Sequence, residues 1–104
     1  MREIGDRRGE AIGLVNMGAT QLKLGQHPKS LANNQTALEI FREIGVREGE
    51  AEALKNLAEL HQALGEVAVA RQFCEQALAL ATELGIPLKA ECETLLQALE
   101  QGEA

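Results

Sequence analysis

The chain has 104 residues, a formal net charge of −6 and two aromatic side chains, Phe41 and Phe73. An acidic chain with so few aromatics lacks both the cationic surface and the base-stacking side chains of nucleic-acid-binding proteins, so that class is excluded. The charge is uneven, because residues 52–104 carry nine acids and three bases. We therefore expect a protein or peptide partner to be basic.

The sequence also lacks the patterns of membrane, exported and metal-binding proteins. No window approaches the ~18 consecutive apolar residues of a transmembrane helix, and the first residues lack the charged-then-apolar order of a signal peptide. Cys74 and Cys92 are too few and too far apart for a disulfide scaffold or a CxxC motif. We expect a cytoplasmic protein with reduced thiols, no membrane contact, no metal and no cofactor.

The chain repeats itself at an offset of 40 residues. Ile4–Ala11 aligns with Ile44–Ala51, and thirteen of the forty pairs that begin at Ile4 are identical. A third start appears at Leu84, Gly85 and Ile86. Self-similarity at a fixed period of this length is typical of a solenoid.

Apolar residues recur three and four apart within each unit, which predicts helices and no strand. Gly25 and Gly65 divide the units, Gly45 and Gly85 stand at predicted helix ends, and Pro28 suits a first helical turn. The predicted helices span residues 7–24, 28–44, 47–64, 67–84 and 87–101.

The stretch from Asn56 to Leu78 resembles a tetratricopeptide repeat. The matching positions are a large-then-small pair, a turn glycine, two small residues in the second helix and a following apolar site: Leu57, Ala58, Gly65, Ala70, Ala77 and Leu78. The first unit is a weaker copy, with Ser30 at a small-residue site and Asn34 where a large apolar side chain is usual. The period of 40, against about 34 in the common repeat, is similar to variants in kinesin light chains and bacterial regulatory proteins.

This resemblance implies an all-α solenoid of antiparallel helix pairs. We expect one domain over residues 1–104, with repeat 1 at about 6–45, repeat 2 at about 46–85 and a capping helix at about 87–101. The cap is needed because an end repeat cannot bury its apolar face alone. Its predicted buried stripe is Leu88, Cys92, Leu95, Leu96 and Leu99.

In the family, the first helix of each pair lines a concave groove that binds peptides. Projected onto this sequence, the groove candidates are Ile12, Val15, Asn16, Ala19, Leu22, Lys23, Glu52, Lys55, Asn56, Glu59, Gln62 and Ala63. The first helix then carries two apolar stripes. Leu14, Met17 and Leu24 are expected to pack inside the solenoid, whereas the groove stripe has no obvious partner within the chain: Ile12, Val15, Ala19 and Leu22.

Three explanations of the groove stripe stay open: a partner or self-association surface, a missing neighbouring repeat in a fragment, or cover by residues 1–5. Asn16 and Asn56 share one repeat position, where the family uses asparagine to bind a peptide backbone; a structural bond between helices is the alternative. The run of polar residues around Asn34 is either a weakly packed face or a face toward a second copy.

The family's clamp for chaperone C-termini is not expected, since only Asn56 matches it; the other positions hold Val15, Ala19, Cys92 and Leu96.

Catalysis is not expected either. Glu48, Glu50 and Glu52 are two apart and point in different directions on a helix. His27, expected to be solvated in a turn, and His61, expected in the interior or at the groove edge, lack metal-ligand spacing.

The sequence therefore predicts a non-catalytic protein-interaction module that binds a peptide or helix in the groove. The alternatives are a structural self-assembly unit, including a homodimer that exchanges helices, and a fragment of a longer repeat array.

Overall fold

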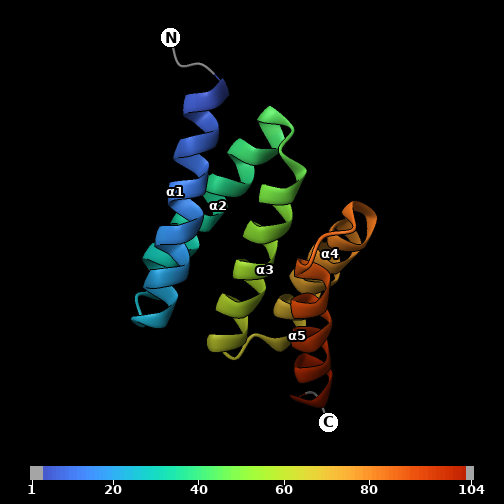
Figure 1. Ribbon diagram of the computed structural model, residues 1–104. Coiled ribbons are helices and arrows are strands. Elements are labelled where there is room, and N and C mark those ends of the chain that lie inside the picture. Colours follow the sequence, from blue (N-terminus) through green and yellow to red (C-terminus); the bar gives the residue numbers. More distant parts are fainter. Residues whose placement is uncertain (1–3, 103–104) are drawn as a thin grey trace.

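The computed structural model describes residues 4–102 as five helices joined by short turns (Figure 1). Their bounds are Ile4–Lys23 (α1), His27–Ile44 (α2), Arg47–Ala63 (α3), Val67–Leu84 (α4) and Leu88–Gly102 (α5). The helices expected from the sequence are all present, and their ends agree within a few residues. The expected cover by residues 1–5 lies outside the described residues, apart from the backbone of Ile4 and Gly5.

The second helix of each pair ends at a glycine in the left-handed conformation. The φ angle is 75° at Gly45 and 66° at Gly85, a region that a side chain makes costly. The next amide then turns back: Val46 N–H donates to the Phe41 carbonyl oxygen at 2.9 Å and Ile86 N–H donates to that of Ala81 at 3.2 Å. These bonds satisfy carbonyls that the helix end leaves without a partner, so the predicted helix ends are confirmed.

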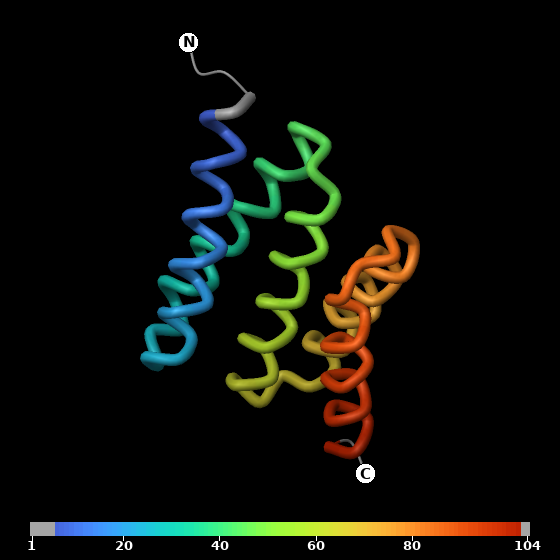
Figure 2. Tube along the Cα trace, in the orientation of Figure 1, coloured from blue at the N-terminus to red at the C-terminus, as the bar shows by residue number. Residues whose placement is uncertain are grey.

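Each helix packs against the next one in the chain, and the first helices of the pairs lie side by side, α1 with α3 and α3 with α5 (Figure 2). The resulting body is elongated and thin, with extents of 50 × 31 × 17 Å. Ion pairs repeat with the period of the sequence, since Arg7–Glu43 joins α1 to α2 at 2.7 Å and Arg47–Glu83 joins α3 to α4 at 2.9 Å. The all-α helix-pair architecture is confirmed.

Helix α3 is the centre of the core because it has neighbours on several sides. Leu54, Leu57 and Leu60 are at most 2% exposed, and fully burying one such side chain stabilises the fold by about 1.5–3 kcal/mol. Helix α5 closes the end as expected: Cys92 and Leu99 are buried, with Leu88, Leu95 and Leu96 packed beside the core. Its opposite face is exposed and polar, with Lys89, Glu93, Gln97 and Glu100. Glu91 was expected on that face as well, but it pairs with Lys55 of α3.

The expected orientation of α1 holds for Leu14, which packs against the core, but was wrong for Met17, Leu24 and Val15. Met17 is 50% exposed and Leu24 66% exposed, whereas Val15 is 4% exposed and Leu22 packs against the core. The inward face follows positions 11, 15, 18 and 22, which are spaced by four, three and four residues and therefore lie on one side of a helix. Larger side chains suggested the other face, but Ala11 and Gly18 allow closer approach of α2.

A buried polar network joins α1, α2 and α3. The Ser30 hydroxyl donates to the Gly18 carbonyl oxygen at 2.7 Å, Asn34 Nδ2 donates to the Ser30 carbonyl oxygen at 3.0 Å, and Asn56 Nδ2 donates to Asn34 Oδ1 at 3.1 Å. A Cβ at Gly18 would overlap the Asn34 amide. Asn34 therefore points into the molecule, so neither alternative, a weakly packed face or a face toward a second copy, describes it. Bonding of this kind offsets the cost of burying amides.

Candidate functional site

Two hollows lie along the row of first helices, the first between α1 and α3 and the second between α3 and α5. We call the surface that contains both hollows the groove. It is the side on which the family resemblance placed binding.

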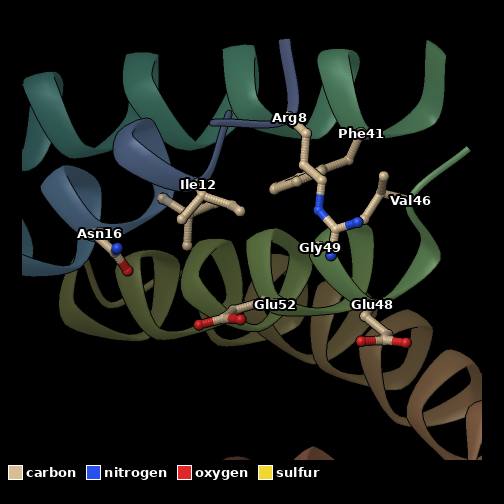
Figure 3. Close-up of a pocket in the computed structure, with 9 residues that line it drawn as sticks. Arg8, Ile12, Asn16, Phe41, Val46, Glu48, Gly49 and Glu52 are labelled. Atoms are coloured by element: carbon tan, nitrogen blue, oxygen red, sulfur yellow. The ribbon is translucent and has the colours of Figure 1, made fainter. Parts of the chain in front are cut away.

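The first hollow has a volume of about 140 Å³. Its floor is apolar: Val15 and Phe41 are buried beneath it, while Ile12 is 44% exposed. Figure 3 shows Ile12 extending from α1 toward α3, with Glu48 and Glu52 standing on α3 at the other wall. The remaining lining residues are Arg8, Asn16, Val46 and Gly49.

The second hollow is wider, with a volume of about 410 Å³. Lys55, Glu59 and Gln62 of α3 line one wall, and the wall from α5 consists of Glu91, Thr94, Leu95 and Ala98. Lys55 Nζ lies 3.4 Å from both Glu59 Oε1 and Glu91 Oε1. Burial acts to lower the pKa of Lys55, but the two carboxylates outweigh it, so the pKa is raised and the ammonium is charged at neutral pH. The Lys55 ammonium thus forms ion pairs with two glutamates of the groove, one on α3 and one on α5.

The structure brings some of the candidate residues together and separates others from the groove surface. Ile12, Val15, Asn16 and Glu52 line the first hollow, and Lys55, Glu59 and Gln62 line the second. Neither hollow includes Ala19, Leu22, Lys23, Asn56 or Ala63.

Val15 and Asn56 are 4% and 6% exposed, so Val15 lies at the bottom of the first hollow and Asn56 lies beneath the groove surface. Val15 faces inward with Ala11 and Gly18, and Asn56 is held by hydrogen bonds inside the chain.

The sequence projection missed four polar or charged groove residues: Arg8, Glu48, Glu91 and Thr94. Arg8 and Glu48 each lie one helical turn before a residue that was projected, Ile12 and Glu52, so helical spacing alone was enough to find them. The α5 residues were missed because that helix was expected only to cap the fold.

A family model described as tetratricopeptide repeat matches residues 9–83. The chain belongs to the tetratricopeptide repeat family. No curated protein matches the chain. Tetratricopeptide repeats are generally protein-interaction modules with a scaffold-type fold and typically no catalytic activity. None of the described helices has the length and the apolar run that a membrane crossing requires.

Asn16 and Asn56 share one repeat position in this tetratricopeptide chain but have different surroundings. Asn16 is exposed at the first hollow. Asn56 is buried, and its Nδ2 donates to the Val15 carbonyl oxygen at 3.3 Å as well as to Asn34. The bond between helices is therefore the interpretation that fits Asn56, while Asn16 keeps an amide available to a ligand.

Neither histidine of this tetratricopeptide chain forms a metal site among the described residues. His61 stacks on Phe73 with ring centroids 5.3 Å apart and its Nδ1 lies 2.6 Å from Glu66 Oε1. His27 is partly exposed as the first residue of α2. Within residues 4–102, no group of three or more His, Cys, Asp or Glu side chains is placed to hold a metal ion.

The two thiols are buried where α5 covers α4. Burial raises the pKa of Cys74 to about 11 and also raises that of Cys92. Cys74 Sγ donates to the Cys92 carbonyl oxygen at 3.3 Å. At neutral pH both thiols are protonated and shielded, which is the opposite of what an activated nucleophile needs.

Proposed function

We propose that the groove binds a basic peptide or helix of a partner protein, with an apolar side chain in the first hollow. The observation that carries this proposal is the apolar floor at Ile12 beside two carboxylates, Glu48 and Glu52. Neither carboxylate forms an ion pair with another described residue. A Lys or Arg next to a bound Leu or Ile would place its charge against them.

Charge along the rest of the groove supports the same class of partner. The hollows hold four glutamates, Glu48, Glu52, Glu59 and Glu91, against two cations, Arg8 and Lys55. An acidic surface raises the local concentration of a basic ligand and speeds its association. The apolar contact at Ile12 then adds a term that salt does not screen.

A charge reversal tests the groove. Glu48→Lys combined with Glu52→Lys is expected to weaken binding of a labelled peptide of alternating Lys and Leu about tenfold or more, because two attractive contacts become repulsive. Fluorescence anisotropy at two salt concentrations measures the dissociation constant and its salt dependence.

The matched control reverses the same amount of charge on the outer face of α5, through Glu93→Lys and Glu100→Lys, which are exposed and line neither hollow. This control variant should keep most of the affinity for the peptide. An equal loss from both double variants would show that only the net charge of the protein attracts the peptide, and the proposal would then be wrong.

A further inference from the structure

The outer face of α1 is uncovered, although the same face of α3 is covered by another helix. At equivalent repeat positions, Met17 is 50% exposed and Leu57 is 1% exposed. Gly13 is likewise exposed and Ala53 is 0% exposed. The difference arises because α3 is packed by α2 in addition to its other neighbours, whereas α1 contacts only α2 and α3 among the described helices. The packing of α2 on α3 therefore shows which kind of helix fits on this face.

The contact between α2 and α3 depends on a glycine that receives an aromatic ring. Phe41 of α2 is 2% exposed, and a Cβ at Gly49 of α3 would overlap the Phe41 ring. Glycine is therefore the residue that fits at this position, although inside a helix it is less favourable than alanine. The close packing of Phe41 compensates for that cost.

Gly9 occupies the same repeat position in α1 as Gly49 in α3, 40 residues earlier. It lies inside a helix, and a Cβ placed on it would meet nothing within 4 Å. The reason for a glycine at residue 49 is thus absent at residue 9 among the described residues. Gly13 lies one turn further and Met17 one turn beyond it, both exposed. We call this face the seat, and the open space above Gly9, where a ring would fit, the socket.

A second copy of the chain does not supply such a ring. The sequence contains two aromatic residues, and both are in use: Phe41 is buried against Gly49 and Phe73 stacks on His61. The occupant must bring an aromatic side chain of its own. Helix α2 presents its aromatic ring from an amphipathic helix, on a buried face that is apolar around Phe41.

We propose that the outer face of α1 docks an amphipathic helix of a partner, with an aromatic ring over Gly9 and apolar side chains against Gly13 and Met17. This surface is separate from the groove, because none of these three residues lines either hollow. It does not rest on the function proposed above. A chain with both surfaces binds two partners at once.

An inserted copy of the first helix pair serves as the probe. A second copy of residues 5–44, placed between Ile4 and Gly5, preserves the 40-residue period and brings its own Phe41 eight residues before Gly9, the separation of Phe41 and Gly49. In the natural chain, Gly9→Ala should raise the thermal midpoint by roughly 2–8 °C, since alanine favours the helix and its Cβ meets nothing. In the extended chain, the Gly9→Ala change in the original, second copy should lower the thermal midpoint, because the added Cβ would overlap the Phe41 ring of the inserted copy.

Two controls isolate the socket. Gly13→Ala should raise the midpoint in both chains, because α3 already carries Ala53 beneath α2. Replacing the inserted Phe41 with Ala should restore a stabilising effect of Gly9→Ala in the extended chain. If Gly9→Ala stabilises both chains equally, or if the natural chain dimerises and Met17→Glu abolishes the dimer, this proposal is wrong.

A peptide gives a test that does not depend on folding of the extended chain. Residues 27–44, linked covalently between the exposed positions 35 and 39 to hold the helix, are titrated into the natural chain and followed by NMR. Shifts at Gly9, Gly13 and the Met17 methyl group, with at least about tenfold weaker binding after Phe41→Ala in the peptide, are expected. Equal binding by both peptides, or no shift at these residues, contradicts the proposal.

Discussion

Deleting residues 87–104 is expected to abolish cooperative unfolding and to leave a product that aggregates. Helix α5 covers a cluster formed by Ala58, Ala70 and Cys74, into which Leu99 inserts. Its buried stripe contributes several side chains at about 1.5–3 kcal/mol each when fully buried, a large share of the 5–15 kcal/mol typical of a domain. Thermal circular dichroism and light scattering measure the effect.

The control for this deletion keeps the helix but changes its outer face. Lys89, Glu93 and Gln97 are exposed, so replacing all three with Ala should leave the shape of the melting transition unchanged. A truncated chain that melts as cooperatively as the natural one would show that α5 is not needed to close the fold.

Leu57→Ala is expected to lower the free energy of unfolding by about 2–5 kcal/mol, because a cavity replaces a side chain that is 1% exposed. Met17→Ala changes the same repeat position in α1, where the side chain is 50% exposed. It should alter stability by no more than about 0.5 kcal/mol. Urea denaturation of the two variants gives both values on one scale.

The comparison of these two variants also tests the exposure of α1 in solution. A loss of stability at Met17 as large as that at Leu57 would mean that α1 is covered there. The described structure would then be missing a contact, and the open seat at Gly9 and Gly13 would not exist in the free protein.

The positions of the helices follow from local features of the sequence. Gly45 and Gly85 end helices because they adopt the left-handed conformation without strain, and Pro28 fits the first turn of α2. The repeat then fixed the order of the helix pairs, since each unit must cover the apolar face of the next. For these reasons the all-α solenoid and the buried face of α5 were predictable.

The orientation of α1 was not predictable by the same reasoning. An end helix has neighbours on fewer sides than its repeat equivalent, so the positions that are buried in α3 are not all buried in α1. Met17 is apolar like its repeat equivalent Leu57, but no helix covers it. Val15 is buried, whereas its repeat equivalent Lys55 lines the second hollow. Copying the burial pattern from one repeat to the other fails at the ends of an array.

The buried amides escaped prediction for a different reason. In the sequence, Asn34 interrupts an apolar stripe, and its partners lie elsewhere. It bonds to Ser30 of the same helix and to Asn56 of α3, and it fits only because Gly18 of α1 has no side chain. Such networks depend on side chains that are distant in sequence, so spacing along one helix does not reveal them. The groove was predictable only in part, because the apolar stripe of α5 indicates a capping helix and does not show that Glu91 and Thr94 line the second hollow.

The most direct test of the proposed function is to map the binding surface of the natural chain by NMR. During titration with the Lys and Leu peptide, backbone amide shifts should concentrate at Arg8, Ile12, Asn16, Glu48 and Glu52, which line the first hollow. Shifts that spread instead over the outer faces of α2 and α4, or an absence of shifts at the first hollow, would contradict the account.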